Sequence, residues 1–172
     1  FGYSISEMQS AAEFPSYVEP CAVVYSQPDL DVQVTMGMGL LGIRMVAINA
    51  TPETPEGEGF RSMVTPSIPL TPLQIARDMW LLDESRMVKL AKHGIANQRV
   101  LDLHKMAHES LDISVKALQE RRYDVAISAA RHAWGYESRA YPDVQKTAID
   151  VVQGVLFYLA ILLPFAFFGE RL

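Results

Sequence analysis

The chain has 172 residues, enough for one domain with a core or a small domain with an appendage, and too few for two full-sized domains. Its composition, 49% hydrophobic and 20% charged, excludes a disordered chain and a collagen. The formal net charge of −5 comes without a basic run that could neutralise phosphates, which argues against nucleic acid as a partner. Cys21 is the only cysteine, so an intramolecular disulfide and a cysteine-rich zinc site are excluded.

Residues 1–70 predict a small β-rich part, which is acidic overall. Apolar and polar residues alternate from Val32 to Met38, the period that turns one face of a strand toward a core. The segment from Ile43 to Ala50 is typical of a second strand, and the glycines between the two segments indicate a hairpin or two adjacent strands. We expect one more extended segment from Phe60 to Leu70.

Residues 51–59, with the sequence TPETPEGEG, predict a solvated acidic loop within this part. Two prolines, two glycines and three glutamates cannot form a core. We interpret Glu53, Glu56 and Glu58 as solubilising surface.

Residues 71–141 predict a helical segment with three antiparallel helices over 72–92, 97–120 and 123–139. Thr71 and Gln74 have the spacing of a capping box at the start of the first helix. A stripe of mostly apolar residues predicts the buried face of the second helix, and an alanine face predicts close packing of the third. The stripe consists of Val100, Leu103, Ala107, Leu111, Ser114 and Leu118, and the alanine face of Ala126, Ala129, Ala130 and Ala133.

The second and third of these helices contain a short stretch, from Ala117 to Ala133, that resembles a single tetratricopeptide-like helical hairpin. The similarity lies in the spacing of Tyr123 and of the alanines that follow it, while Arg121 or Arg122 replaces the usual glycine of the turn. No second copy at a period of 34 follows, so the sequence does not predict a repeat array. The resemblance implies a tight antiparallel helix pair.

A row of potential metal ligands lies on the second helix, where His104, His108 and Asp112 follow one another at intervals of four. This spacing places three such side chains on adjacent turns. The row runs from the buried stripe to its edge, so a packed histidine with a polar partner, a divalent metal such as zinc, and acid–base chemistry are three alternatives. A metal would need a further ligand such as Glu109 or His132. The zinc-protease signature is absent, because Asp112 stands where its second histidine would be needed.

The C-terminal part, residues 142–172, predicts a membrane helix. Tyr141–Pro142 predicts the end of the third helix, since the residue before proline avoids the helical region and proline suits the start of a new helix. Val151 to Gly169 is then nineteen residues without a charge. At 1.5 Å per residue it spans about 28 Å, close to the thickness of a bilayer core. The alternative is a buried central helix of a soluble protein.

The sequence therefore predicts an α+β chain with a β-rich part at 1–70, a helical segment at 71–141 and a transmembrane helix at 142–172. We expect a membrane-anchored interaction or structural module, a fragment of a larger envelope or transport-associated protein, with a protein partner and with residues 1–141 extracytoplasmic. The lipid bilayer is a partner through Val151 to Gly169. The alternative is a metal-dependent enzyme or metal sensor that uses His104, His108 and Asp112, and no catalytic set points to another enzyme.

Overall fold

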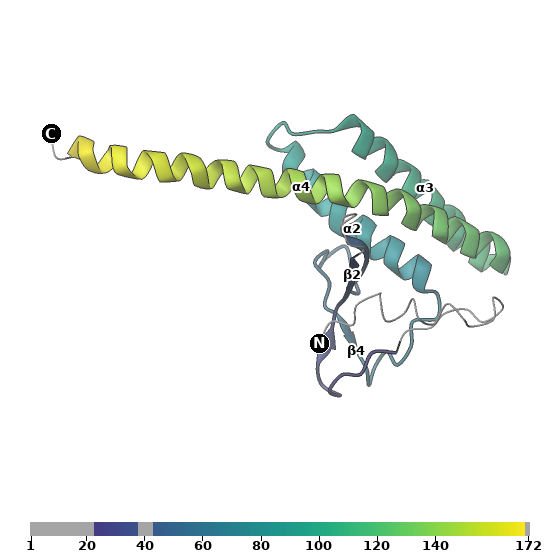
Figure 1. Ribbon diagram of the computed structural model, residues 1–172. Helices are drawn as coiled ribbons and strands as arrows, with labels where there is room; N and C mark the ends of the chain where they lie inside the picture. The colour runs from purple at the N-terminus through teal and green to yellow at the C-terminus, as the bar shows by residue number, and fades with distance from the viewer. Residues whose placement is uncertain (1–22, 38–42, 171–172) are drawn as a thin grey trace.

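The computed structural model describes residues 23–37 and 43–170, which form a mostly helical α+β fold (Figure 1). Within these ranges, four short strands pair into two small antiparallel sheets, and three helices follow. The elements are β1 (Asp31–Val32), β2 (Val34–Gly37), β3 (Ile43–Ala47), β4 (Phe60–Arg61), α2 (Thr71–Ala91), α3 (Gln98–Gln119) and α4 (Tyr123–Glu170).

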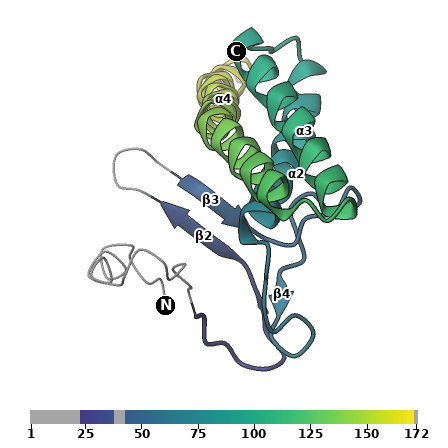
Figure 2. The same cartoon turned by 90° about the vertical axis from the view of Figure 1, so that its right-hand side faces the viewer.

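The strands confirm the predicted hairpin. Strand β2 pairs with β3 so that Val34 lies opposite Ala47, and Figure 2 shows the two strands side by side. Val34 and Met36 are half-buried while Thr35 is exposed, as the alternation predicts. Met38, the last residue of the predicted alternation, lies outside the described residues. Strand β1 pairs with β4, but the extended segment expected from Phe60 to Leu70 stops at Arg61, and turns follow it.

The β-rich part is attached to α2 by Asp78, a buried carboxylate. Its two oxygens accept hydrogen bonds from the backbone N–H groups of Ile48 (2.8 Å), Asn49 (2.9 Å) and Ala50 (3.0 Å). Gln74 donates a fourth hydrogen bond to the same carboxylate. Three backbone donors that no strand partner satisfies are thereby paired, which avoids the cost of leaving them buried and unbonded.

The predicted acidic loop 51–59 is confirmed as a surface loop without strand or helix. Glu53, Glu56 and Glu58 are exposed. The loop returns against β3, because Gly59 donates its N–H to the carbonyl oxygen of Ile48 at 2.8 Å. Gly57 has a φ of +74°, and a Cβ atom there would lie 2.2 Å from the same carbonyl oxygen, so only glycine fits.

The three helices pack with α2 parallel and α3 antiparallel to the first part of α4. Ala76 of α2 and Leu111 of α3 meet Ala133 of α4 in one buried cluster. Further along α4, Val100 at the start of α3 meets Val144, and Met87 near the end of α2 packs against the same cluster. The alanine face is buried throughout, and so are four of the six predicted residues on α3, Val100, Ala107, Leu111 and Ser114.

Helix α2 begins where the sequence predicts, but not by the predicted capping box. Leu70 is the N-cap, and no side chain caps the free amides. The hydroxyl of Thr71 donates to the carbonyl oxygen of Ile68. Gln74 is turned toward Asp78. The Gln74 side chain, which a capping box would have used, is therefore hydrogen-bonded to the buried Asp78 carboxylate instead.

Helix α4 continues through Pro142, which corrects the predicted break at Tyr141–Pro142. A proline inside a helix costs about 3 kcal/mol or more, because one backbone hydrogen bond is lost. Ala140, Tyr141 and Val144 are buried on both sides of it. Burial of a large apolar side chain stabilises by about 1.5–3 kcal/mol, so the packing of Tyr141 and Val144 offsets the cost of the proline.

Beyond the bundle, α4 projects as a single exposed helix (Figure 1). Within Tyr123–Pro164, the most apolar stretch of 18 residues has a mean hydropathy of 1.8. None of this stretch is buried. By length and composition the helix could cross a membrane. The alternative of a buried central helix does not apply within this chain, because no other described element covers the apolar segment.

The turn between α3 and α4 holds Arg121 in the left-handed region, with a φ of 60°. The N–H of Arg122 donates to the carbonyl oxygen of Ala117, and that of Arg121 to Leu118, the pattern of a Schellman motif. The helix pair implied by the tetratricopeptide-like spacing is present. An arginine occupies the position where glycine has no steric penalty.

We predict that Arg121→Gly stabilises the chain by about 1 kcal/mol, because it removes the left-handed strain of a residue with a Cβ atom. Urea unfolding of the full chain in detergent, followed by circular dichroism, measures the change. Arg122→Gly is the matched control and should destabilise. An Arg121→Gly variant less stable than the native chain would contradict this account of the turn.

Candidate functional site

A buried polar cluster lies where the three helices meet, centred on His104 of α3. Its Nδ1 atom is 2.9 Å from Oε1 of Glu137 on α4, and its Nε2 atom is 3.0 Å from Oε2 of Glu84 on α2. His104 and Glu137 are buried, whereas the Glu84 side chain is 46% exposed. Both ring nitrogens face carboxylates, so the geometry favours the doubly protonated imidazolium, which donates to each.

Burial and the neighbouring charges act in opposite directions on the pKa values of His104 and Glu137. Burial lowers the pKa of His104, but the hydrogen bonds and negative charges of Glu137 and Glu84 outweigh it and raise the pKa above its usual value. Burial raises the pKa of Glu137, and the bond to His104 opposes that change only in part. The pair therefore retains its protons to a higher pH than the same groups in water.

Asp83 adds a second buried carboxylate to the cluster. Burial, followed by the negative charge of Glu137, raises its pKa to about 7. Arg86 lies 3.3 Å from Asp83 and also stacks over the ring of Tyr141, 5.1 Å from the ring centre. One oxygen each of Asp83 and Glu137 is buried with no hydrogen-bond partner among the described residues. Near neutral pH a proton on Asp83 relieves the repulsion between the two carboxylates.

The structure separates His104 from His108 and Asp112, the other two members of the predicted row. His104 is buried and paired with carboxylates of other helices, while His108 and Asp112 are exposed and lie 3.8 Å apart. Trp80 of α2 stacks on both histidine rings, at 5.0 Å from His104 and 4.7 Å from His108. The histidines thus pack on an indole instead of converging on one point.

The two further ligands that the metal hypothesis required lie elsewhere. Glu109 is exposed and 3.9 Å from Lys105. His132 borders a shallow depression of about 360 Å³ between α3 and α4, away from His104. Among the described residues no group of three histidine, cysteine, aspartate or glutamate side chains could hold a metal ion. The metal-dependent alternative stays a prediction without support from the geometry.

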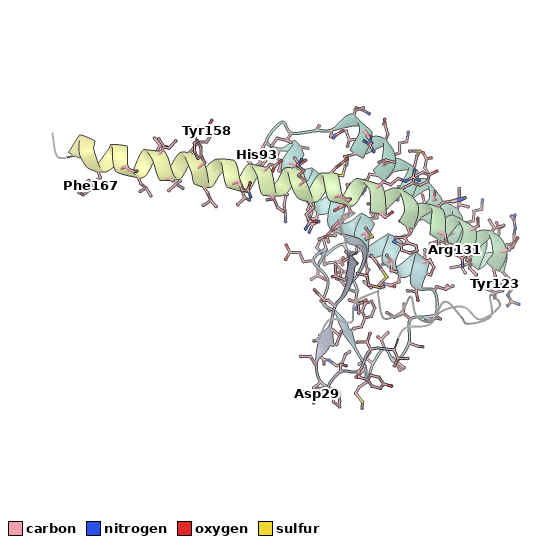
Figure 3. The ribbon with its side chains drawn as sticks, in the orientation of Figure 1. Asp29, His93, Tyr123, Arg131, Tyr158 and Phe167 are labelled. Carbon is pink, nitrogen blue, oxygen red and sulfur yellow. The ribbon has the colours of Figure 1, made fainter. Side chains whose placement is uncertain are left out.

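The second candidate site is the exposed apolar segment of α4, which we define as residues 149–163. Ten of its large apolar side chains are 47–68% exposed. Figure 3 shows Tyr158 and, beyond the segment, Phe167 projecting from opposite sides of the helix. The exposed members are Ile149, Val152, Val155, Leu156, Phe157, Tyr158, Leu159, Ile161, Leu162 and Leu163. A soluble monomer rarely exposes so continuous an apolar surface, and surfaces of this kind mark protein–protein or membrane interaction sites.

Sequence reasoning missed the two buried carboxylates of the cluster. Asp83 follows Ala76, Met79 and Trp80 on the inward stripe of α2, and Glu137 follows Ala133 by one turn on the alanine face of α4. An acid on an apolar stripe is a signal of a buried ion pair, since unpaired carboxylates are almost never buried. That signal could have identified both residues, although not the pairing of Glu137 with His104 or of Asp83 with Arg86.

No protein-family model, curated protein or solved structure is significantly similar to this chain.

We predict that the bundle is more stable at about pH 5 than at about pH 8. Asp83 has a folded pKa of about 7, above its value of 3.8 in the unfolded chain, so stability is lost as pH rises between these values. Between pH 5 and the folded pKa the loss is about 3 kcal/mol, at about 1.4 kcal/mol per pH unit. The raised pKa values of His104 and Glu137 act in the same direction.

Asp83→Asn tests this prediction, because the amide keeps the shape of the carboxyl group and cannot ionise. Urea unfolding as a function of pH should show the variant more stable than the native chain at high pH, with a weaker pH dependence. Asp112→Asn is the matched control at an exposed site and should leave the pH dependence unchanged. Equal pH dependence of native chain and Asp83→Asn would disprove the assignment.

Proposed function

We propose that this chain is a membrane-anchored interaction module, in which α4 spans the bilayer and the bundle presents the β-rich part to a protein partner. The observation that carries the proposal is the continuity of α4 from the buried face of the bundle into the exposed apolar segment. A helical segment that no other described element covers, with a mean hydropathy of 1.8 over 18 residues, is suited to lipid.

The continuous backbone of α4 supports the membrane part of the proposal. In a helix the backbone N–H and C=O groups are paired within the segment, apart from the one bond that a proline removes, so almost no polar backbone group is left unbonded in hydrocarbon. Pro164 lies inside the helix, and membrane helices tolerate proline better than soluble ones. Tyr158 and Phe157 contact each other edge to face on the exposed segment.

The interaction part of the proposal rests on apolar side chains exposed in the β-rich part. Tyr25 is 87% exposed and Met63 is 74% exposed. Val23, Val24, Leu30 and Val64 are exposed as well. An apolar surface of this kind next to acidic residues suits a protein partner, and a larger envelope or transport assembly is the class of partner that we propose.

The side of the membrane stays a prediction. The acidic, strand-bearing N-terminal part favours an extracytoplasmic position for residues 1–141. Lys89, Lys92 and Lys146 favour the opposite side, because lysine and arginine next to a span are enriched in the cytoplasm.

We predict that the chain remains in the membrane pellet after an alkaline carbonate wash and that Leu159→Arg weakens this association. Leu159 is 47% exposed in the middle of the apolar segment, and an arginine there opposes insertion by about 2.5–3.5 kcal/mol on insertion scales. Ile113→Arg, on α3 at 52% exposure, is the matched control and should behave as the native chain.

Truncation after Ala148 completes this test. The truncated chain keeps Ala140 and Val144, the last residues of α4 in the buried clusters, so it should be soluble and helical. A native chain found in the soluble fraction, or a truncated chain that loses its helical circular dichroism signal, would refute the membrane proposal.

We predict that a photo-reactive amino acid at Tyr25 forms an adduct of one discrete mass with a protein in native membranes. The same amino acid at Lys105, whose side chain is 77% exposed on the helical bundle, is the control and should give no such adduct. Gel analysis with an antibody against the chain measures both. Equal adducts from the two positions, or none from Tyr25, would count against a partner on the β-rich part.

A further inference from the structure

Cations are concentrated at one end of the helical bundle. The seventeen residues from Ser85 to Leu101 contain two arginines, two lysines and His93, and they contain no acid, although the chain as a whole has a net charge of −5. This stretch comprises the end of α2, the α2–α3 loop and the start of α3. Arg86 is engaged with Asp83 and Tyr141. Lys89, Lys92, His93 and Arg99 are exposed, and we call these four residues the cationic end.

The cationic end lies at the level where α4 leaves the bundle. Met87 and Val100 pack against Val144. Lys92 lies five residues beyond Met87 along α2, and Val151 lies seven beyond Val144 along the parallel α4. At 1.5 Å per residue, Lys92 at the start of the α2–α3 loop therefore lies within roughly 3 Å, measured along the helix axis, of Val151, where the uncharged run begins. Figure 3 shows His93 beside this part of α4.

The surroundings of the cationic end combine apolar and charged groups. Val88 and Leu101, on the same stretch, are 45% and 40% exposed. Lys146 on α4 adds a cation, and Asp143 and Asp150 on the same helix add two acids. The Asp102 carboxylate accepts a hydrogen bond from Gln98. Long cationic side chains beside exposed apolar ones are suited to a membrane interface, where the stem contacts acyl chains and the charge contacts headgroups.

Helix stability does not account for this distribution of charge. Lysines in the last turn of α2 do complement the negative end of its dipole. Arg99, however, is in the first turn of α3, where an acid would be favoured, and that turn contains no acid. An anion outside the chain would explain both sets of cations together.

We propose that the cationic end binds the anionic headgroups of phospholipids in the bilayer that α4 spans. This inference rests on the proposed membrane anchoring and adds a lipid class to it. Each lysine or arginine close to an anionic membrane surface contributes roughly a fivefold preference, so three such residues enrich anionic lipid locally. The effect is electrostatic and weakens as salt increases.

The test uses the full chain with Cys21→Ser and Ala96→Cys, which carries a fluorophore on the exposed α2–α3 loop. The chain is reconstituted into vesicles of two parts phosphatidylcholine and one part phosphatidylglycerol, in which either one lipid or the other carries bromine as a quencher. We expect brominated phosphatidylglycerol to quench more strongly than its share of the lipid predicts. High salt should remove this excess.

The variant Lys89→Gln, Lys92→Gln and Arg99→Gln should lose the excess quenching. Its matched control is Lys116→Gln, Arg121→Gln and Arg122→Gln, which removes three cations at the opposite end of the bundle and should keep the excess. Quenching in proportion to lipid composition in the native chain, or equal loss in both variants, would overturn the inference. A chain that a carbonate wash releases from the vesicles would instead overturn the membrane anchoring, so the two failures are distinguishable.

Discussion

The packing of α4 against α2 and α3 is the contact on which the rest of the structure depends. Its small residues, such as Ala126 and Ala133, let α3 approach closely, and Tyr141 extends the same face to the core beneath β3. Because this face is buried over about five turns, from Ala126 to Val144, the helix tolerates Pro142 and continues without a break out of the bundle. The apolar segment then has a fixed direction relative to the helices.

The buried charges add a different constraint to the same helices. His104, Glu84 and Glu137 come from three helices, so their hydrogen bonds form only when α2, α3 and α4 are in one register. Apolar residues of equal volume would often be as stabilising, because desolvation offsets much of the attraction in a buried ion pair. A wrong register would leave the Glu137 carboxylate unpaired in the interior, which costs several kcal/mol. The cluster is therefore better explained as a determinant of helix register than as a source of stability.

The sequence allowed prediction of the elements that depend on local periodicity. The β2–β3 hairpin, the acidic loop, the limits of α2 and α3 and the buried alanines of α4 all follow from patterns within a few turns or strands. The continuation of α4 through Pro142 could not be predicted, because it depends on the burial of Tyr141 and Val144 by residues far away in the sequence. The same reason explains why the row from His104 to Asp112 gave only part of the site. Helical spacing places side chains on one face, but the partners of His104 come from α2 and α4.

A rigid connection between bundle and span has consequences for how such a chain would meet a membrane. Since α4 passes without a linker from the buried face into the apolar segment, any tilt of the span in the bilayer tilts the bundle by the same angle. The α2–α3 loop lies beside the start of the apolar segment, whereas the β-rich part is attached through Asp78 near the middle of α2. In the membrane arrangement that we propose, this end of the bundle would face the lipid surface, and the β-rich part would lie to the side of α4. Contact between cations and headgroups at that end would restrict the tilt, and so would set the height at which the exposed apolar residues near Tyr25 are presented to a partner.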